Sequence, residues 1–257
     1  MRRPVTAALA VLAVLVPAAS LVALAAGAAS TPRLTVYAAA SLTNVLPRID
    51  PGPRYSFGGS NTLAAQITLG APADVFASAN TTLPAALAAK GLCTKPVVFT
   101  RNALVIVVPR SNPAHIRSIY DLARPRVKVD IAAAGVPVGH HTLQILKSLG
   151  LSRRVLANVV SRETDVRGVL AKVALGEADA GFVYATDART VPGRVRVVAV
   201  PARAQPDVRY GICVVSSSGR KPAAHAFVAR LLSTAGQAKL LRAGFLPRVE
   251  PKPAMKG

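Results

Sequence analysis

Tryptophan is absent from this sequence, and aromatic residues of all kinds make up only 4% of its 257 residues. Few side chains are therefore available to stack on nucleic-acid bases. The net charge is strongly positive, +21 from 32 lysines and arginines, but the basic residues are scattered along the chain. We therefore expect no nucleic-acid partner, and we interpret the charge as a basic, solvated surface that can also attract an anion toward a cleft.

Acidic residues are also scarce, because aspartate and glutamate together number only 11. They are too few and too scattered for a cage of carboxylates around a hard metal ion. The motifs of common enzymes are missing as well, since the chain has no G-x-S-x-G loop, no Walker A loop and no G-x-G-x-x-G turn. We expect neither enzymatic activity nor a cofactor.

Two of the four histidines, His140 and His141, adjoin in the sequence. Adjacent residues point in different directions from a helix, so the pair lacks the i, i+4 spacing of two metal ligands on one helix face. We expect both to lie in an exposed first helical turn. The alternative is that they form a cationic fringe beside an anion site.

The N-terminal segment has the features of an export signal. Arg2 and Arg3 precede a run from Val5 to Ala29 without any charge, and residues 26–28 have the A-x-A pattern of a peptidase site. The prediction is a signal peptide over residues 1–28 and a protein exported to the periplasm or the cell surface. The uncharged run is also long enough to span a bilayer, so an uncleaved membrane anchor is the alternative.

Cys93 and Cys213 are the two cysteines of the chain, and their separation excludes the C-x-x-C spacing of zinc and redox sites. An even number of cysteines in an exported protein permits one disulfide. Cys213 lies in an apolar, β-branched stretch, where a buried free thiol is equally consistent. The sequence therefore leaves the two alternatives open.

Apolar, β-branched runs alternate with helical segments along the rest of the chain. Predicted strands cover residues 34–38, 54–57, the stretch that ends at 77, 104–108, 127–132, 180–184, 194–200 and 209–215. Predicted helices cover residues 62–69, 82–90, 142–149, 166–175, 223–232 and 235–243, while 155–160 is either a strand or a helix end. This order predicts an α/β protein with parallel sheets and helices on both faces. The long apolar runs at Leu104 and Ile212 are the expected crossings between two lobes.

Two short segments, residues 38–44 and 58–67, each follow a predicted strand and carry a small hydroxyl residue where a helix is expected to begin. Because successive parallel strands end at the same edge of a sheet, Ser41, Ser60 and the helix N-terminal N–H groups would converge on one spot. Such a spot is suited to an anion. The alternative is that Ser41, Ser60 and Thr62 are ordinary helix N-caps.

Five segments, in the same order, resemble the periplasmic molybdate-binding proteins of molybdate ABC importers. They are Tyr37-Ala-Ala-Ala-Ser-Leu-Thr-Asn44, Gly59-Ser-Asn-Thr-Leu-Ala64, Gly70-Ala-Pro-Ala-Asp-Val-Phe-Ala-Ser78, Asp165-Val-Arg-Gly168 and Gly181-Phe-Val-Tyr-Ala-Thr-Asp187. The resemblance implies a type II periplasmic-binding-protein fold, with two α/β lobes of mixed sheets flanked by helices and a two-strand hinge. It places the first lobe at residues 33–101 and 211–249, the second lobe at 102–210, and a flexible tail at 250–257.

The resemblance also implies a ligand site without a counter-cation. Its donors would be the hydroxyl and backbone N–H groups of Ser41 and Ser60. The backbone N–H groups of Val138 and Val166 and the phenol of Tyr184 complete the set. Molybdenum would be held only as molybdate through these residues, with no direct bond between the protein and the metal.

Two departures from the family's pattern bear on this site. Asn61 follows Ser60 where the family frequently has serine, and its amide is an additional candidate donor. Val138 stands where alanine is common, so the expected cavity is smaller.

The function implied is that of a monomeric extracytoplasmic solute-binding protein. It would capture molybdate or tungstate between its lobes and deliver the anion to a membrane ABC permease. The alternatives are another tetrahedral oxyanion, such as sulfate or phosphate, or a sensor or enzyme on the same scaffold. An enzyme needs a base in the cleft, and we expect the nearest candidate, Asp165, to cap a helix instead.

Overall fold

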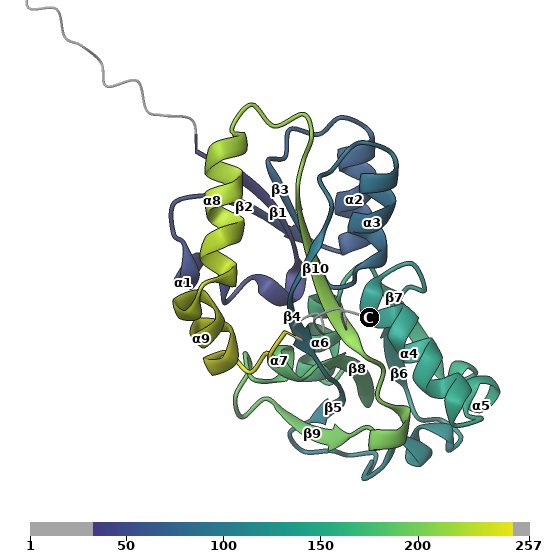
Figure 1. The fold of residues 1–257 in the computed structure, drawn as a ribbon. Coiled ribbons are helices and arrows are strands. Elements are labelled where there is room, and N and C mark those ends of the chain that lie inside the picture. The colour runs from purple at the N-terminus through teal and green to yellow at the C-terminus, as the bar shows by residue number, and fades with distance from the viewer. Residues whose placement is uncertain (1–32, 249–257) are drawn as a thin grey trace, which may run out of the picture. The chain divides into compact units, whose positions relative to one another are not determined.

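Two five-stranded sheets form the framework of residues 33–248, the part of the chain that the computed structural model describes. With the helices that cover them, they make the two-lobed α/β fold expected from the sequence (Figure 1). The predicted signal peptide at residues 1–28 and the predicted tail at 250–257 lie outside the described residues. Within residues 33–248, no helix has the length and apolar character needed to cross a membrane.

The first sheet has the strand order β2-β1-β3-β10-β4. Its strands are β1 (Thr35–Ala39), β2 (Arg54–Gly58), β3 (Val75–Ser78), β4 (Val97–Asn102) and β10 (Val208–Val214). Strand β1 runs parallel to β2 and β3, whereas β10 runs antiparallel to β3 and β4. Helices α2 (Ser60–Thr68) and α3 (Thr82–Ala89) lie on one side, and α1 (Leu46–Ile49), α8 (Lys221–Leu232) and α9 (Thr234–Arg242) on the other (Figure 1). This sheet with its helices is the first lobe.

The second sheet has the strand order β7-β6-β8-β5-β9. Its strands are β5 (Leu104–Pro109), β6 (Val129–Ala132), β7 (Val159–Glu163), β8 (Ala180–Tyr184) and β9 (Val195–Ala199). Strand β6 runs parallel to β7 and β8, whereas β5 runs antiparallel to β8 and β9. Its helices are α4 (Pro137–Ser148), α5 (Ser152–Leu156), α6 (Val166–Leu175), α7 (Ala185–Ala188) and the short 3-10 helix Ile119–Ala123. This sheet with its helices is the second lobe.

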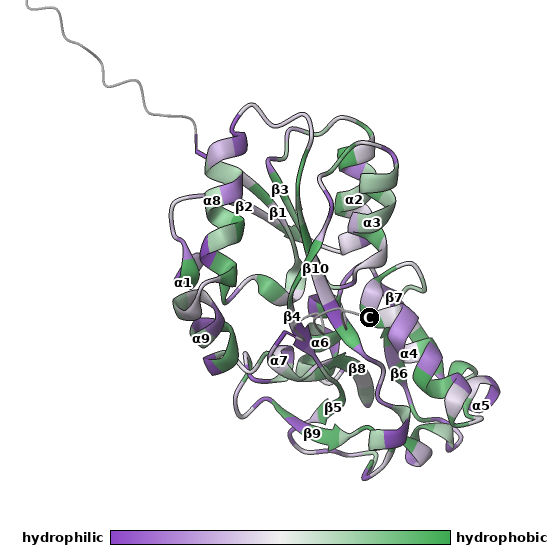
Figure 2. Ribbon diagram, in the orientation of Figure 1, coloured by the Kyte–Doolittle hydropathy of each residue, from purple (hydrophilic) through white to green (hydrophobic). Residues whose placement is uncertain are grey.

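The apolar residues of both lobes lie mainly on the strands and on the inner helix faces (Figure 2). Strand β5 shows the pattern most clearly, because every residue of Leu104–Pro109 except Val105 is buried. A strand covered by helices on both faces has no polar side to offer, which explains its continuous β-branched run. The predicted buried strand at residues 104–108 is confirmed.

The sheets are mixed, as the family resemblance implied, and not purely parallel, as the alternation of strands and helices suggested. Parallel neighbours need a crossover, usually a helix. No α-helix separates β4 from β5, which follow each other across Ala103, and only the 3-10 turn Ala202–Ala204 separates β9 from β10. At both connections the chain passes from one sheet to the other, and the strands on either side of each connection pair antiparallel within their own sheets. Strand β4 was not predicted, because its second half, Thr100-Arg101-Asn102, is polar.

The same two connections carry the chain between the lobes. Asn102 at the end of β4 pairs with Val208 at the start of β10. Strand β10 of the first sheet therefore starts three residues before residue 211, where the first lobe was expected to resume. Asp207, at this point, forms ion pairs with Arg101 at 3.0 Å and with Arg209 at 2.6 Å. The lobe limits given above stay a prediction.

Two helices of the second lobe begin beside the first lobe. Helix α4 begins at Pro137, earlier than the predicted start at residue 142, because proline is well suited to a first helical position. Gly139 lets this turn pack closely, since a β-carbon there would lie 2.1 Å from the carbonyl oxygen of Ala133. Helix α6 begins at Val166 and ends before the left-handed Gly176, as predicted. The ambiguous residues 155–160 contain both the end of α5 and the start of β7.

Cys93 and Cys213 form a disulfide, with their Cα atoms 5.9 Å apart. The bond joins the segment after α3 to strand β10, and both residues belong to a small apolar cluster that includes Leu63 and Phe76. Cys93 also forms an isolated β-bridge with Val215. Of the two alternatives that the sequence left open, the structure has the disulfide and no free thiol at either residue.

Removal of this disulfide should lower the free energy of unfolding by about 3–5 kcal/mol, because a long loop in the unfolded chain is then no longer closed. Urea unfolding of the wild type and of the Cys93→Ser, Cys213→Ser double variant, each with and without a thiol reductant, measures the effect. The reductant should destabilise the wild type and leave the double variant unchanged. Equal stability of the two oxidised proteins would contradict the prediction.

Asp130 is a buried carboxylate in strand β6. It is 0% exposed, and neither of its oxygens accepts a hydrogen bond from a side chain among the described residues. Burial, with a smaller contribution from the negative Glu163, raises the pKa of Asp130 to about 7, although Lys172 opposes the shift. The native protein therefore holds this proton more tightly than the unfolded chain does.

This shift makes the stability depend on pH. A carboxyl whose pKa is raised by folding favours the native state at low pH, and that contribution is lost between about pH 4 and about pH 7. Asp130→Asn is neutral throughout, so we expect the variant to be more stable than the wild type by about 1–3 kcal/mol near neutral pH. Near pH 4 the two should be equally stable in urea unfolding. A difference that does not change with pH would overturn this assignment.

Candidate functional site

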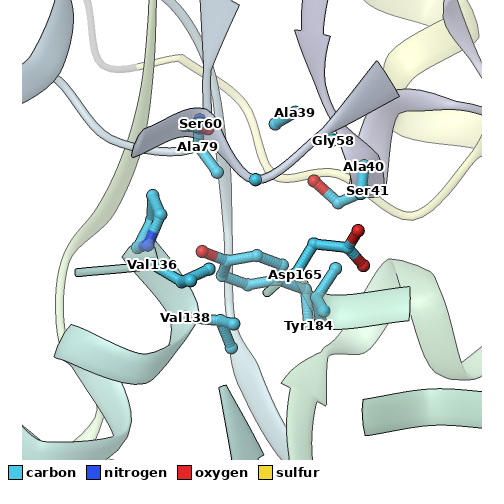
Figure 3. Close-up of a pocket in the computed structure, with 13 residues that line it drawn as sticks. Ala39, Ala40, Ser41, Gly58, Ser60, Ala79, Val136, Val138, Asp165 and Tyr184 are labelled. Atoms are coloured by element: carbon cyan, nitrogen blue, oxygen red, sulfur yellow. The ribbon is translucent and has the colours of Figure 1, made fainter. Parts of the chain in front are cut away.

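A small cavity of about 10 Å³ lies between the two lobes (Figure 3). It is lined by Ala39, Ala40, Ser41, Gly58, Gly59, Ser60, Ala79, Val136, Pro137, Val138, Asp165, Val166 and Tyr184. The first lobe contributes the segments that follow β1, β2 and β3, and the second lobe contributes the starts of α4 and α6 and the end of β8. The carboxyl ends of parallel strands are where α/β proteins place their ligands. All five donors predicted from the sequence line this cavity.

Three helices of eight or more residues begin at the cavity, namely α2, α4 and α6. The first N–H groups of a helix have no intrahelical partner and carry a partial positive charge. The backbone N–H groups of Ser60, Val138 and Val166 donate to no acceptor among the described residues. They are therefore available to an anion in the cavity.

Asp165 explains why the N–H of Val166 is left over. Its carboxylate caps helix α6 and accepts the backbone N–H groups of Arg167 at 2.7 Å and Gly168 at 3.1 Å. The cap thus satisfies the second and third N–H groups of the helix and leaves the first. The expectation that Asp165 is a cap is confirmed.

The two serines are not N-caps, so the alternative that treated them as ordinary caps is wrong. Gly59 is the N-cap residue of α2, and Ser60 is the first helical residue, whose Oγ accepts the backbone N–H of Ala79 at 3.1 Å. Ser41 lies inside the 3-10 helix Ala40–Leu42, and its Oγ lies 2.8 Å from the hydroxyl of Tyr210. Thr62 is an exposed residue of α2. The side-chain oxygen of each serine therefore contacts a residue outside the helix to which the serine belongs.

Tyr184 ends strand β8 and directs its hydroxyl into the cavity (Figure 3). The residue is 1% exposed, and its hydroxyl lies near that of Tyr210 without the geometry of a hydrogen bond to it or to any other described group. Burial is the largest cause that raises the pKa of this phenol far above its usual range, so the phenol stays protonated. Buried polar groups normally have a partner. A neutral donor without one points to a ligand that supplies the acceptor.

Asn61 does not line the cavity. Its side-chain amide lies beside Gly59 and Gly135, and its Oδ1 accepts no hydrogen bond from the described residues. His140 and His141 lie at the end of the first turn of α4, where His140 is exposed as expected and His141 is half-buried. Neither lines the cavity. Burial lowers the pKa of His141, so this histidine is neutral at pH 7 and adds no positive charge to the site.

Arg167 is a residue that the sequence did not single out, and it connects the two lobes. Its Nη2 donates to Oδ1 of Asn44 in the first lobe at 2.8 Å, and its Nη1 donates to Oγ1 of Thr190 in the second lobe at 3.2 Å. Its Nε lies 3.0 Å from the buried carboxylate of Asp187. The position after the Asp165-Val166 pair was the only sequence signal that could have drawn attention to it.

The site therefore consists of hydrogen-bond donors that converge from both lobes on a small space. One carboxylate, Asp165, lines the cavity, and its Oδ1 is already engaged by two backbone N–H groups. No cluster of three or more metal-ligating side chains occurs among residues 33–248. This arrangement is suited to a small anion rich in acceptors and fully removed from water.

Comparisons with known proteins agree with this geometry. Residues 34–246 match the family of bacterial extracellular solute-binding proteins. The molybdate-binding protein ModA of Mycobacterium tuberculosis is 39% identical over 222 residues, which cover 82% of this chain and 84% of that protein. The structure of the periplasmic molybdate-binding protein of Azotobacter vinelandii superimposes with a TM-score of 0.75 at 23% identity, over 86% of this chain and all of that one. The sulfate-binding protein SubI of M. tuberculosis superimposes with a TM-score of 0.74 at 20% identity, over 84% and 87% of the two chains.

Proposed function

Because this chain belongs to the family of bacterial extracellular solute-binding proteins, we propose that it captures molybdate between its two lobes and delivers it to a membrane ABC permease. Tungstate, a tetrahedral dianion of the same charge, is proposed as a second ligand of the same donors. The basis for molybdate over other anions is the 39% identity with a molybdate-binding relative over most of both chains. We further propose an exported, monomeric protein without enzymatic activity.

The observation that carries this proposal is the buried, unpaired hydroxyl of Tyr184 in a cavity lined by helix N-termini. Molybdate is fully ionised at pH 7 and offers only acceptors to its surroundings. The donors proposed for it are the N–H groups of Ser60, Val138 and Val166, the hydroxyls of Ser41 and Ser60, and the phenol of Tyr184. Hydrogen bonds to an ionised group are stronger than neutral ones, which offsets the cost of removing the dianion from water.

The surroundings favour an anion as well. A neighbouring cavity of about 290 Å³ is also bordered by Ser41. Three arginines from both lobes line it, namely Arg48, Arg189 and Arg242. None of the three forms an ion pair with an acidic residue in the described part of the chain. These three arginines place part of the overall charge of +21 beside the cleft, which raises the local concentration of anions.

We infer that binding is coupled to closure of the lobes. The first lobe offers Ser41 and Ser60, and the second offers Val138, Val166 and Tyr184. Neither lobe alone surrounds a tetrahedral anion, so the closed arrangement is the one with the higher affinity. A ligand with such a preference shifts the lobes toward closure in proportion to that difference.

Two other functions have less support. Sulfate is a smaller tetrahedral dianion, and the likeness to a sulfate-binding protein at 20% identity concerns the fold alone. An enzyme on this scaffold needs a free base in the cavity. Asp165 is the acidic residue of the lining, and its carboxylate already caps α6.

Isothermal titration of the purified exported protein with molybdate, tungstate, sulfate and phosphate tests the proposal. We expect one molybdate or one tungstate to bind per chain, with sulfate and phosphate silent, because the larger dianions reach donors on both lobes. Calorimetry is preferred because the chain has no tryptophan to report binding by fluorescence. Binding of sulfate or phosphate alone would mean that the ligand is that anion and not molybdate. The absence of binding heat with all four anions would refute an oxyanion-binding role.

Loss of a single donor should weaken molybdate binding measurably. Ser60→Ala is expected to cost about 1.5–3 kcal/mol, the scale of a hydrogen bond to a charged group, and Tyr184→Phe should cost a similar amount through its lost phenol. Val166→Ala is the matched control, since its proposed contribution is a backbone N–H that the variant keeps. Unchanged affinity in Ser60→Ala or Tyr184→Phe would remove that side chain from the site.

A further inference from the structure

Two buried polar side chains, Asn102 and Tyr210, lead from the crossing between the lobes to Ser41. Asn102 is the last residue of β4, and its Nδ2 donates to the hydroxyl of Tyr210 at 3.3 Å and to Oγ1 of Thr186 at 2.9 Å. The hydroxyl of Tyr210 lies in turn 2.8 Å from Oγ of Ser41. Asn102 is 3% exposed, Tyr210 is 0% exposed and Ser41 is 4% exposed, so water does not compete for these bonds.

The first hydrogen bond of this chain has a fixed direction, whereas the bond between Tyr210 and Ser41 can run either way. Oδ1 of Asn102 accepts the backbone N–H of Ala103 at 3.0 Å, which fixes the amide with its nitrogen toward Tyr210. An amide nitrogen can only donate, so the oxygen of Tyr210 must accept. Burial raises the pKa of Tyr210 well above its usual range, so its own proton is retained. Oγ of Ser41 lies 2.8 Å from this oxygen, and we assign the Tyr210 proton to the bond between them.

Ser41 is left with one hydroxyl proton and a filled acceptor position. Ser41 lines the cavity, whereas Tyr210 and Asn102 do not. A serine hydroxyl that is free to rotate can present either its proton or a lone pair to a ligand. With Tyr210 as its donor, the proton of Ser41 remains for the cavity, and neighbouring hydrogen bonds of one direction strengthen each other.

We propose that Asn102 and Tyr210 are positioning residues, which orient the Ser41 hydroxyl as a donor to the bound oxyanion. This inference rests on the proposed function, because it concerns the same site. It also gives the crossing between the lobes a direct link to the ligand. Asn102 is held at once by Thr186 of the second lobe and by Tyr210 of the first sheet, so the orientation of Ser41 depends on how the lobes meet.

A double-mutant cycle in molybdate titrations tests this relay. Tyr210→Phe keeps the buried ring and removes the hydroxyl, and we expect about tenfold weaker binding. In a Ser41→Ala background the same change should cost less than about twofold, because no hydroxyl is left to orient. Equal losses in the two backgrounds would overturn the proposal and leave Tyr210 with a packing role only.

Tyr55→Phe is the matched control. Its hydroxyl, in the first lobe, donates to the backbone oxygens of Asp50 at 2.5 Å and Leu46 at 3.3 Å, and it does not line the cavity. This variant removes the same atom and should bind like the wild type. If the wild type itself binds no oxyanion, the proposed function fails and not the relay alone.

A spectroscopic signature separates orientation from packing. The chain has only five tyrosines, so a carbon-13 label at their Cζ atoms gives few signals, and the Tyr210→Phe spectrum identifies the one of interest. The Tyr210 signal should move when molybdate binds to the wild type, because Ser41 then donates to the ligand. In Ser41→Ala it should stay in place. A Tyr210 chemical shift that does not change when molybdate binds to the wild type would contradict the relay.

Discussion

Backbone N–H groups at helix starts are the constraint on which this site depends. Every helix leaves its first N–H groups without a partner, and burial makes that costly unless an acceptor is supplied. Helices α2, α4 and α6 all begin at one cavity, and none of the N–H groups of Ser60, Val138 and Val166 has an acceptor among the described residues. The two mixed sheets matter because they bring these three starts together from opposite sides.

Local details decide which N–H groups stay open. Asp165 takes the second and third N–H groups of α6 and leaves that of Val166. Pro137 has no N–H, so the first available donor of α4 is Val138. The Oγ of Ser60 is occupied by Ala79, which leaves its hydroxyl proton for the cavity. Each feature removes an alternative partner, and together they produce a space surrounded by donors.

The parts of this arrangement that depend on neighbours in sequence were predictable. The start and the end of α6 were predictable, because Asp165 and Gly176 act on backbone groups only a few residues away in the sequence. Contacts across long sequence distances were not. Ser41 was expected to cap a helix, yet its partner, Tyr210, lies 169 residues away. The start of α4 lies five residues before the predicted start at residue 142, because Pro137 occupies the first helical position. The family resemblance, more than periodicity, indicated the five donors.

Contacts between the two lobes lie directly beside the proposed donors. Arg167, next to the donor Val166, reaches Asn44 in the first lobe. Gly59 of the first lobe meets the second so closely that a β-carbon would lie 2.3 Å from the carbonyl oxygen of Thr164. If an oxyanion occupies the cavity, the residues beside its donors on each lobe are also those that touch across the cleft. Ligand affinity and lobe contact are then parts of one equilibrium, because neither can change without altering the other.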